Sequence, residues 1–277
     1  MKTLSRIYMT LIFLMLFAPI FILVIFSFNT SGSTTEFTGL SLKWYIELFK
    51  DEIAFTALKN SLFLAVSSSL IATVIGTFAA LGIDRMKSKK FKFAIKSVTN
   101  IPMMNPDIVT GVSMMLLFVA LGGFLGLSES LGRTSMLIAH VTFNLPYVIL
   151  SVLPKFRQMD PHLSEAALDL GCTPVQTFFK IELPAIVPGI ISGLMLGFTL
   201  SLDDFVISHF VSSPDFITLP LYVYNQTAHE VKYSMYALCT LIIVAVLILL
   251  LCVNFIDPDT FRNRKDKKQK SHSKGGR

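Results

Sequence analysis

Six long apolar runs constrain this chain more than any other feature of its sequence. They cover about residues 7–28, 60–83, 97–121, 134–153, 185–211 and 234–256, and short polar segments separate them. A helix of about 20 apolar residues spans the roughly 30 Å hydrocarbon core of a bilayer. With 53% hydrophobic and 15% charged residues, the chain also lies outside the usual range of soluble domains. The sequence therefore predicts an all-α polytopic membrane protein with six transmembrane helices.

The positions of the 24 Lys and Arg residues predict which loops face the cytoplasm. Nineteen of them lie before the first run, in the second loop, in the fourth loop and after the last run, whereas the opposite loops hold five cations and seven acids. Because cationic residues stay on the cytoplasmic side, we expect both termini to be cytoplasmic. No convincing cleavage site follows the first run, so we expect a retained helix rather than a signal peptide.

Residues 258–277 form a Lys-rich polar tail after a transmembrane domain over residues 1–257, and this composition predicts a disordered cytoplasmic extension. The net charge of +6 is also a property of nucleic-acid-binding proteins. The cations, however, lie next to the apolar runs, where anionic headgroups and membrane insertion account for them. We therefore expect the lipid bilayer, and no nucleic acid, as their partner.

The fourth loop, residues 154–184, contains signals for structure of its own. The dipeptide Asp160-Pro161 is typical of a helix N-cap with proline at the first position, and Gly171 is a favoured residue just after a helix. The segment Thr173–Gln176 fits a capping box that begins a second helix, which we expect to end at Leu183-Pro184. The sequence thus predicts a short cytoplasmic hairpin between the fourth and fifth spans, shaped to fill a groove on another protein.

A longer pattern of residues runs through this hairpin. It resembles the EAA motif of the binding-protein-dependent ABC importer permeases, in spacing and at each of its named positions: Glu165, Ala166, Ala167, Gly171, Ile181, Leu183 and Pro184. The resemblance implies that these residues couple the chain to a cytoplasmic ATPase through a docking helix. Glu165 would be a polar anchor there, and Gly171 would allow a turn at positive φ.

Further segments resemble the permease subunits of spermidine/putrescine importers over nearly the whole chain up to residue 257. They are Ser27-Phe28-Asn29, Lys43-Trp44-Tyr45, residues 104–109, residues 140–143 and residues 198–204. The resemblance implies a permease in the cell membrane of a bacterium. With a second homologous permease it would form the path for polyamines that an external binding protein delivers. A pair of ATPase subunits would bind ATP and Mg²⁺.

Three acids lie within the predicted spans, Asp107, Asp203 and Asp204, whereas no Lys or Arg lies deep within one. Ionisable residues inside a span are costly and mark a solute path or a buried pairing. Uncompensated carboxylates suit a polycation, whose ammonium groups form charge-assisted hydrogen bonds with them. We expect Asp204 to line the path, because it shares a helix face with Ser201 and Ser208, and the other two acids to assist it.

Each acid also has a purely structural interpretation. Asn105-Pro106-Asp107 is equally typical of a helix that restarts in mid-membrane, with the Asp complementing the helix dipole. Asp203 and Asp204 are expected ~27 Å along their span, near its outer end, where water reduces the cost of a charge. The EAA motif also occurs in permeases for sugars, anions and iron, so another small solute is the alternative substrate.

No motif in the sequence indicates a catalytic centre. There is no GxxxxGK[ST] phosphate loop, so ATP hydrolysis requires a separate subunit. The five His residues lack a metal-ligand spacing, and nothing around Asp107 and Asp203 supports a protease dyad. A passive cation channel fits six helices with acids in the spans, but not the hairpin. We therefore expect a transport subunit with no catalytic residues, metal or cofactor of its own.

Overall fold

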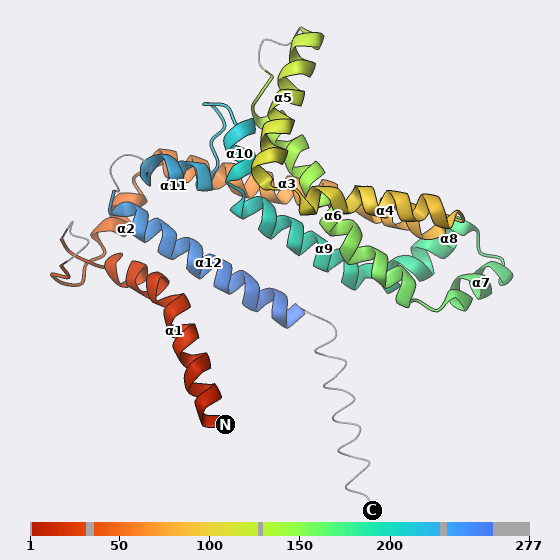
Figure 1. Cartoon of the computed structure of the whole chain (residues 1–277), viewed down its shortest axis with the longest axis horizontal. Coiled ribbons are helices and arrows are strands. Elements are labelled where there is room, and N and C mark those ends of the chain that lie inside the picture. Colours follow the sequence, from red (N-terminus) through yellow and green to blue (C-terminus); the bar gives the residue numbers. More distant parts are fainter. Residues whose placement is uncertain (1, 32–35, 127–129, 228–231, 257–277) are drawn as a thin grey trace, which may run out of the picture. The chain divides into compact units, whose positions relative to one another are not determined.

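The computed structural model (Figure 1) describes residues 2–31, 36–126, 130–227 and 232–256, and the side chains of residues 2–4, 161 and 249–256 lie outside this description. The expected basic tail, residues 258–277, lies outside the described residues as well. The chain divides into two compact units, one formed by Met1–Thr56 with Tyr222–Ile256 and the other centred on Ala57–Leu221.

The described part of the chain is helical, with no β-structure beyond two isolated bridges. Five helical segments are long and apolar enough to cross a membrane, and α12 (Ser234–Ile256) supplies a shorter apolar stretch, Ser234–Ile248. The five lie in α1 (Lys2–Phe26), α3 (Glu52–Arg85), α5 (Asp107–Leu125), α6 (Arg133–Gln158) and the segment that ends with α9 (Leu183–Asp203). The predicted all-α membrane fold is thus confirmed for these residues.

The first unit is built around α12, which packs against α1 and against α2 (Lys43–Leu48). Trp44, at the second position of α2, is buried, and its ring lies 5.2 Å from that of Tyr233. The indole nitrogen of Trp44 donates a hydrogen bond of 2.7 Å to the carbonyl of Asn29. This aromatic contact therefore attaches the chain that follows α1 to the beginning of α12.

The second unit is organised by the close pairing of α6 and α9, which lie side by side along most of their length (Figure 1). Glycines at four-residue spacing on α9 permit this approach, as is common in membrane helices. A Cβ at Gly189 would lie 2.8 Å from the carbonyl oxygen of Ser151, and one at Gly193 would lie 3.3 Å from the Cα of Val148. The two helices are therefore so close that a side chain at either glycine would meet backbone atoms of α6.

The predicted third span, residues 97–121, is not one helix. The structure has α4 (Lys89–Met104) followed by α5, with the backbone of Asn105 extended at φ −83° and ψ 138°. Pro106 explains the break, because proline lacks an N–H and disfavours the helical conformation of the residue before it. Of the two helices, α5 is the one that is long and apolar enough to cross a membrane, and α4 has no buried residue.

The predicted fifth span, residues 185–211, also needs correction at its end. α9 ends at Asp203, Asp204 is extended at φ −66° and ψ 120°, and a separate short helix, α10 (Val206–Val211), follows. α10 packs against α5 and α6. Both corrected spans are thus interrupted beside an acid, the first before Asp107 and the second at Asp204.

The expected end of the hairpin at Leu183-Pro184 is wrong. α8 (Pro174–Thr177), a π-helical turn η1 (Phe178–Glu182) and α9 follow one another without a break, and together they form a helix of 30 residues. In the π turn, the Leu183 N–H donates to the carbonyl of Phe178, five residues earlier. Pro184 lacks an N–H, and proline within a helix usually interrupts it. We attribute the uninterrupted helix to the wider π turn that lies immediately before Pro184.

Two further short helices complete the described chain, α7 (Pro161–Asp169) and α11 (Leu219–Thr227). α7 contacts α8 and η1, so that the segment between α6 and α9 is a hairpin, as predicted. It begins later than residue 154, because α6 continues to Gln158.

Candidate functional site

The hairpin is defined by the local capping interactions that the sequence predicts. At the start of α7, the Asp160 side chain accepts a hydrogen bond of 3.0 Å from the His162 amide. At the start of α8, Thr173 and Gln176 cap each other's backbone amides at 3.3 and 2.9 Å. Gly171 lies between the two arms at φ +86°, a conformation that favours glycine. These predictions for the caps and the turn are confirmed.

The EAA residues of α7 divide between the two faces of that helix. Glu165 is exposed, and one of its carboxylate oxygens lies 3.2 Å from Nδ1 of His162, whereas Ala167 is buried. Ala166 is exposed, and so are Leu163 and Leu168. The outer face of α7 therefore combines small, apolar and acidic side chains.

The remaining predicted coupling residues lie on the second arm, which continues into α9. Ile181 and Leu183 are half-buried, and Pro184 is exposed. Leu183 packs against the apolar cluster that α3, α6, η1 and α9 form around Val152 and Ile186. This end of the pattern therefore connects the hairpin to the packed helices rather than contributing to its outer face.

Sequence reasoning missed Glu182, the residue inside the motif that joins three elements. Its side chain is 8% exposed, and its two carboxylate oxygens lie 3.0 and 2.9 Å from Nη2 of Arg85, at the end of α3. Ser164 of α7 donates a further hydrogen bond of 3.1 Å to Glu182. A buried charge requires a partner, so an acid among apolar residues at the start of a predicted span was the signal that could have indicated these contacts.

Asp204 serves as a cap in this structure. Its carboxylate accepts hydrogen bonds from the amides of Ile207 and Ser208, at 3.3 and 2.8 Å, at the start of α10. The side chain is 8% exposed and lies 3.5 Å from Nε2 of His140. The helix face on which the prediction for Asp204 rested does not exist, because α9 ends one residue earlier.

Ser201 and Ser208 do meet, but around His140 rather than along one helix face. The two ring nitrogens of His140 lie 2.7 Å from the Ser201 hydroxyl and 3.3 Å from that of Ser208. Asn144 donates to Ser201 at 3.3 Å and to Ser68 at 3.4 Å. This buried network joins α3, α6, α9 and α10, and buried polar groups that are hydrogen-bonded in this way specify one arrangement of helices.

Asp203 and Asp107 remain as the exposed acids of the interrupted spans. Asp203 makes no hydrogen bond or ion pair with the other described residues. Asp107 is the first residue of α5, as the helix-restart interpretation expects. α5 approaches α10 closely at Gly111, where a Cβ would lie 2.8 Å from the ring of Phe210. The structure therefore packs the two helices that follow the interruptions against each other.

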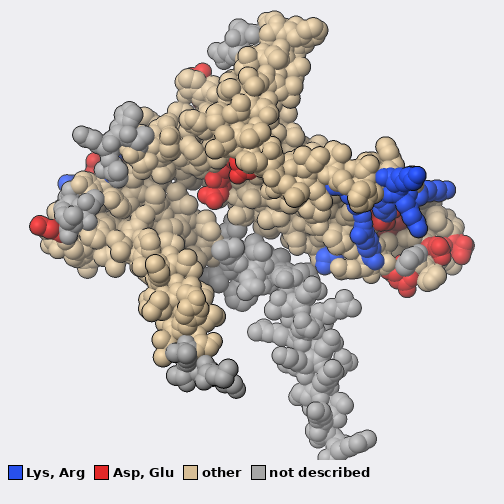
Figure 2. All heavy atoms as spheres, in the orientation of Figure 1, with Lys and Arg blue, Asp and Glu red and all other residues tan. Residues whose placement is uncertain are grey.

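Charges are distributed unevenly over the second unit (Figure 2). Figure 2 shows a small acidic group within a largely uncharged surface, and at one end a gathering of Lys and Arg side chains beside several acidic ones. The exposed cations at the end of α3 and in the first turns of α4 are Arg85, Lys87, Lys89 and Lys90. The hairpin bearing α7 lies at this same end, since Ser164 and Arg85 both contact Glu182.

Comparison with known proteins identifies the family. Residues 72–262 match the family model described as "Binding-protein-dependent transport system inner membrane component". The chain belongs to this family. The family consists of transport subunits that work with an ATPase and a binding protein, and its members are not enzymes. The chain is accordingly a multi-pass permease of the bacterial inner membrane, as the EAA resemblance predicted.

Relatives among characterised proteins cover most of the chain. The putrescine transport system permease protein PotI of Escherichia coli (strain K12) is 42% identical over 234 residues, which are 84% of this chain and 83% of PotI. The spermidine/putrescine transport system permease protein PotC of the same organism is 35% identical over 252 residues, 91% of this chain and 93% of PotC.

Solved structures confirm the fold. A bacterial ABC transporter involved in the import of the acidic polysaccharide alginate matches with a TM-score of 0.73 at 19% identity, over 93% of this chain and 95% of that one. The MetNI methionine ABC transporter matches with a TM-score of 0.60 at 17% identity, over 79% of this chain and 99% of that one. The arrangement of helices described above is thus the arrangement of ABC importer permeases.

Proposed function

We propose that this permease forms, with a second homologous permease subunit, the membrane path for polyamines such as putrescine and spermidine. The proposal rests on a pair of exposed carboxylates, those of Asp107 and Asp203. Each lies where a predicted span is interrupted, and the helices that follow the two interruptions, α5 and α10, pack together. Interrupted helices are frequent at the solute sites of membrane transporters, because they place polar groups at membrane depth.

The charge of these residues suits the proposed solute. An alkyl diamine or triamine carries separated ammonium groups, which form charge-assisted hydrogen bonds with carboxylates, and its methylene segments tolerate apolar walls. No described Lys or Arg lies deep within α5 or α9 to compensate the acids. The names of PotI and PotC, as polyamine permeases, support the same substrate class. Asp203 and Asp107 then line the path, and Asp204 supports it by holding the start of α10.

The source of energy is a pair of cytoplasmic ATPase subunits that bind ATP and Mg²⁺, and this chain binds neither. The outer face of α7, with Glu165, Ala166 and exposed leucines, docks into a cleft on one ATPase subunit. Arg85, Glu182 and Ser164 connect that helix to α3 and α9, so closure of the ATPase pair moves the spans. Alternation between inward-open and outward-open states follows, and an external binding protein delivers the polyamine to the outward-open state.

The topology fits this scheme. The hairpin and the cations of α3 and α4 lie at one end of the second unit, and the positive-inside rule assigns that end to the cytoplasm. By the same rule, the cations before residue 7 and after residue 257 favour the cytoplasmic side for these two segments.

A reconstituted system tests the substrate. The chain is assembled with its partner permease and ATPase in vesicles, the binding protein is added outside, and ATP-dependent uptake of labelled putrescine, spermidine and an uncharged sugar is measured. Uptake of a polyamine but not of the sugar is expected. Uptake of the sugar alone, or polyamine flux that persists without ATP, would overturn the proposal.

A second experiment tests the docking helix. Ala166→Trp enlarges the exposed face of α7 without changing its charge, and co-purification with the ATPase is expected to fall on the order of tenfold, because a contact surface does not accommodate the added volume. Ala94→Trp, at an exposed position of α4, is the matched control and should retain the ATPase. Equal ATPase recovery with both variants would exclude α7 as the docking element.

A further inference from the structure

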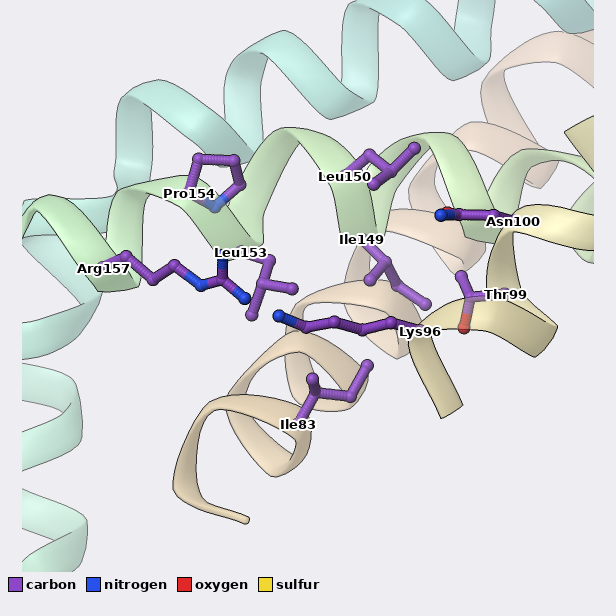
Figure 3. A pocket seen from close by; sticks show the side chains of 9 residues that line it. All are labelled: Ile83, Lys96, Thr99, Asn100, Ile149, Leu150, Leu153, Pro154 and Arg157. Carbon is purple, nitrogen blue, oxygen red and sulfur yellow. The ribbon is translucent and has the colours of Figure 1, made fainter. Parts of the chain in front are cut away.

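A groove in the second unit lies between the end of α3, the middle of α4 and the last turns of α6 (Figure 3). It has a volume of about 180 Å³. Its walls are aliphatic side chains from α3 and α6, including Ile83, Ile149 and Leu153. Its polar groups come from Lys96, Thr99 and Asn100 on α4 and from Arg157 on α6. The groove is thus apolar on one side and cationic on the other.

Two cations converge on this groove. Figure 3 shows the Lys96 ammonium group reaching across it toward the side chain of Arg157. No acid lines the groove, and among the described residues neither cation forms an ion pair with Asp or Glu. The neighbouring cations differ in this respect, since Arg85 pairs with Glu182 and Lys92 with Asp84. Like charges that face each other without a counter-ion are unfavourable, and an anion bound between them removes this repulsion.

The position of the groove along α6 indicates which anion fits. Arg157 lies in the last turn of α6, at the end that the cations assign to the headgroup region. Leu150, seven residues earlier, also lines the groove and is 40% exposed. By helical rise the two residues are ~10 Å apart along the axis. The groove therefore extends from the level of headgroups to the level of acyl chains. A lipid uses both ends, whereas a free phosphate would use only the charged end.

We propose that this groove binds an anionic phospholipid, with Lys96 and Arg157 contacting the phosphate-bearing headgroup and the aliphatic wall contacting an acyl chain. The bound lipid fastens α4 to α6. α4 has no buried residue of its own, so its attachment to the unit depends on such surface contacts. Basic pockets between membrane helices on the cytoplasmic side are a known means of binding anionic headgroups.

The test uses the full-length chain in the assembled transporter. It is purified from membranes that contain phosphatidylglycerol and phosphatidylethanolamine, and the retained lipids are identified by native mass spectrometry. We expect preferential retention of the anionic phosphatidylglycerol. The double variant Lys96→Gln/Arg157→Gln should retain on the order of tenfold less of it, because two charge-assisted contacts are lost.

A matched control removes the same charge elsewhere. Lys87→Gln/Lys90→Gln changes two exposed cations of the same region that do not line the groove, and it should retain the lipid like the original chain. If both double variants lose lipid equally, general surface charge explains the binding and the proposal is overturned. The conservative variant Lys96→Arg, which keeps the positive charge, should retain the lipid, and loss of lipid by this variant would contradict a charge-assisted contact.

The source of the phosphate is tested separately. Adding phosphatidylglycerol to delipidated transporter should raise its unfolding temperature, and millimolar inorganic phosphate should not. An equal rise with inorganic phosphate would assign the groove to a free anion and overturn the lipid assignment. Neither result depends on the transported solute, so this inference and the proposed polyamine function can fail independently.

Discussion

Arg85 and Glu182, 97 residues apart in the sequence, form a contact in which one guanidinium nitrogen bridges both carboxylate oxygens, at 3.0 and 2.9 Å. The contact joins the last residue of α3 to the residue before α9, and Ser164 adds α7 to it. Glu182 is almost fully buried, whereas Arg85 is 48% exposed. The acid is therefore the member of the pair that depends most on its partners.

Glu182→Gln should weaken this junction. The variant keeps the size of the side chain but loses the charge, so we expect a loss on the order of 1 kcal/mol in stability, reduced by the exposure of Arg85. We also expect solute uptake to fall more than ATP hydrolysis, because the hairpin is less firmly joined to α3. Thermal unfolding and the ratio of solute transported to ATP hydrolysed measure the two effects.

Asp169→Asn, which changes an exposed acid of the same hairpin, is the control. An unchanged ratio in Glu182→Gln would remove the junction from the coupling mechanism.

The adjacent acids Asp203 and Asp204 should respond differently to the same substitution. Asp203→Asn should lower polyamine uptake several-fold and leave the unfolding temperature unchanged, since its side chain is exposed and makes no described contact. Asp204→Asn should lower the unfolding temperature at a cost of about 1 kcal/mol, because the amides of Ile207 and Ser208 donate to different carboxylate oxygens and the NH2 group of Asn cannot accept the second of these bonds. Uptake by vesicles and thermal unfolding in detergent distinguish them. The reverse result, with Asp203 affecting stability and Asp204 only uptake, would contradict the assignment.

Gly189→Ala should destabilise the pairing of α6 and α9. The added Cβ would lie 2.8 Å from a backbone oxygen of α6, which cannot move aside as a side chain can. We expect a cost of about 1–3 kcal/mol, as for overpacked cores. Gly82→Ala is the control, because nothing lies within 4 Å of a Cβ there and alanine favours the helix. Thermal unfolding of the two variants should shift in opposite directions.

The contact between Tyr222 and Asp51 in the first unit predicts a pH dependence. Burial alone raises the pKa of Asp51, but the Tyr222 hydroxyl, at 2.6 Å, and two backbone amides outweigh it and hold the pKa below its ordinary value of 3.8. A lowered folded-state pKa contributes stability that is present above the ordinary value and is lost as the pH falls through the folded value.

Tyr222→Phe removes this donor. At neutral pH the variant should be less stable by on the order of 1 kcal/mol, because it loses this hydrogen bond. The loss is no larger because much of Asp51 is solvated. The difference from the original chain should shrink as the pH falls below about 4. Unfolding temperatures across pH 3 to 7, with Tyr8→Phe at an exposed position as control, measure it. A difference that stays constant with pH would show that the hydroxyl acts independently of the carboxylate.

Features that depend on neighbouring residues could be predicted from the sequence. The caps at Asp160 and Thr173, the turn at Gly171 and the break before Pro106 all follow from interactions within a few positions. Pro184 was misinterpreted as the end of a helix, because the π turn that precedes it has no simple sequence signal. The end of α9 at Asp203 was missed for a related reason. The apolar run continues through it, and the interruption depends on a cap for α10 and on contacts with α6.

The partners of the site residues were less predictable than their positions. Arg85 and Glu182 meet only because α3 and α9 pack in the same unit. In the same way, His140 contacts Ser201 and Ser208, which lie on two different helices. Such contacts join segments that are distant in sequence, so neither periodicity nor spacing indicates them. For the same reason the sequence did not indicate that the Asp204 carboxylate caps α10, beyond the end of the α9 face on which the prediction for the path relied.

The unbroken helix from Pro174 to Asp203 has a mechanical consequence. Its 30 residues span about 45 Å, with the hairpin at one end and an exposed carboxylate at the other. The tight packing of Gly189 and Gly193 on α6 lies between these ends and holds α9 against α6 there. A rotation of this helix as one rigid body displaces both of its ends at once, over its full length of about 45 Å. A push on the hairpin would then reach the far acid directly, without a relay of side chains.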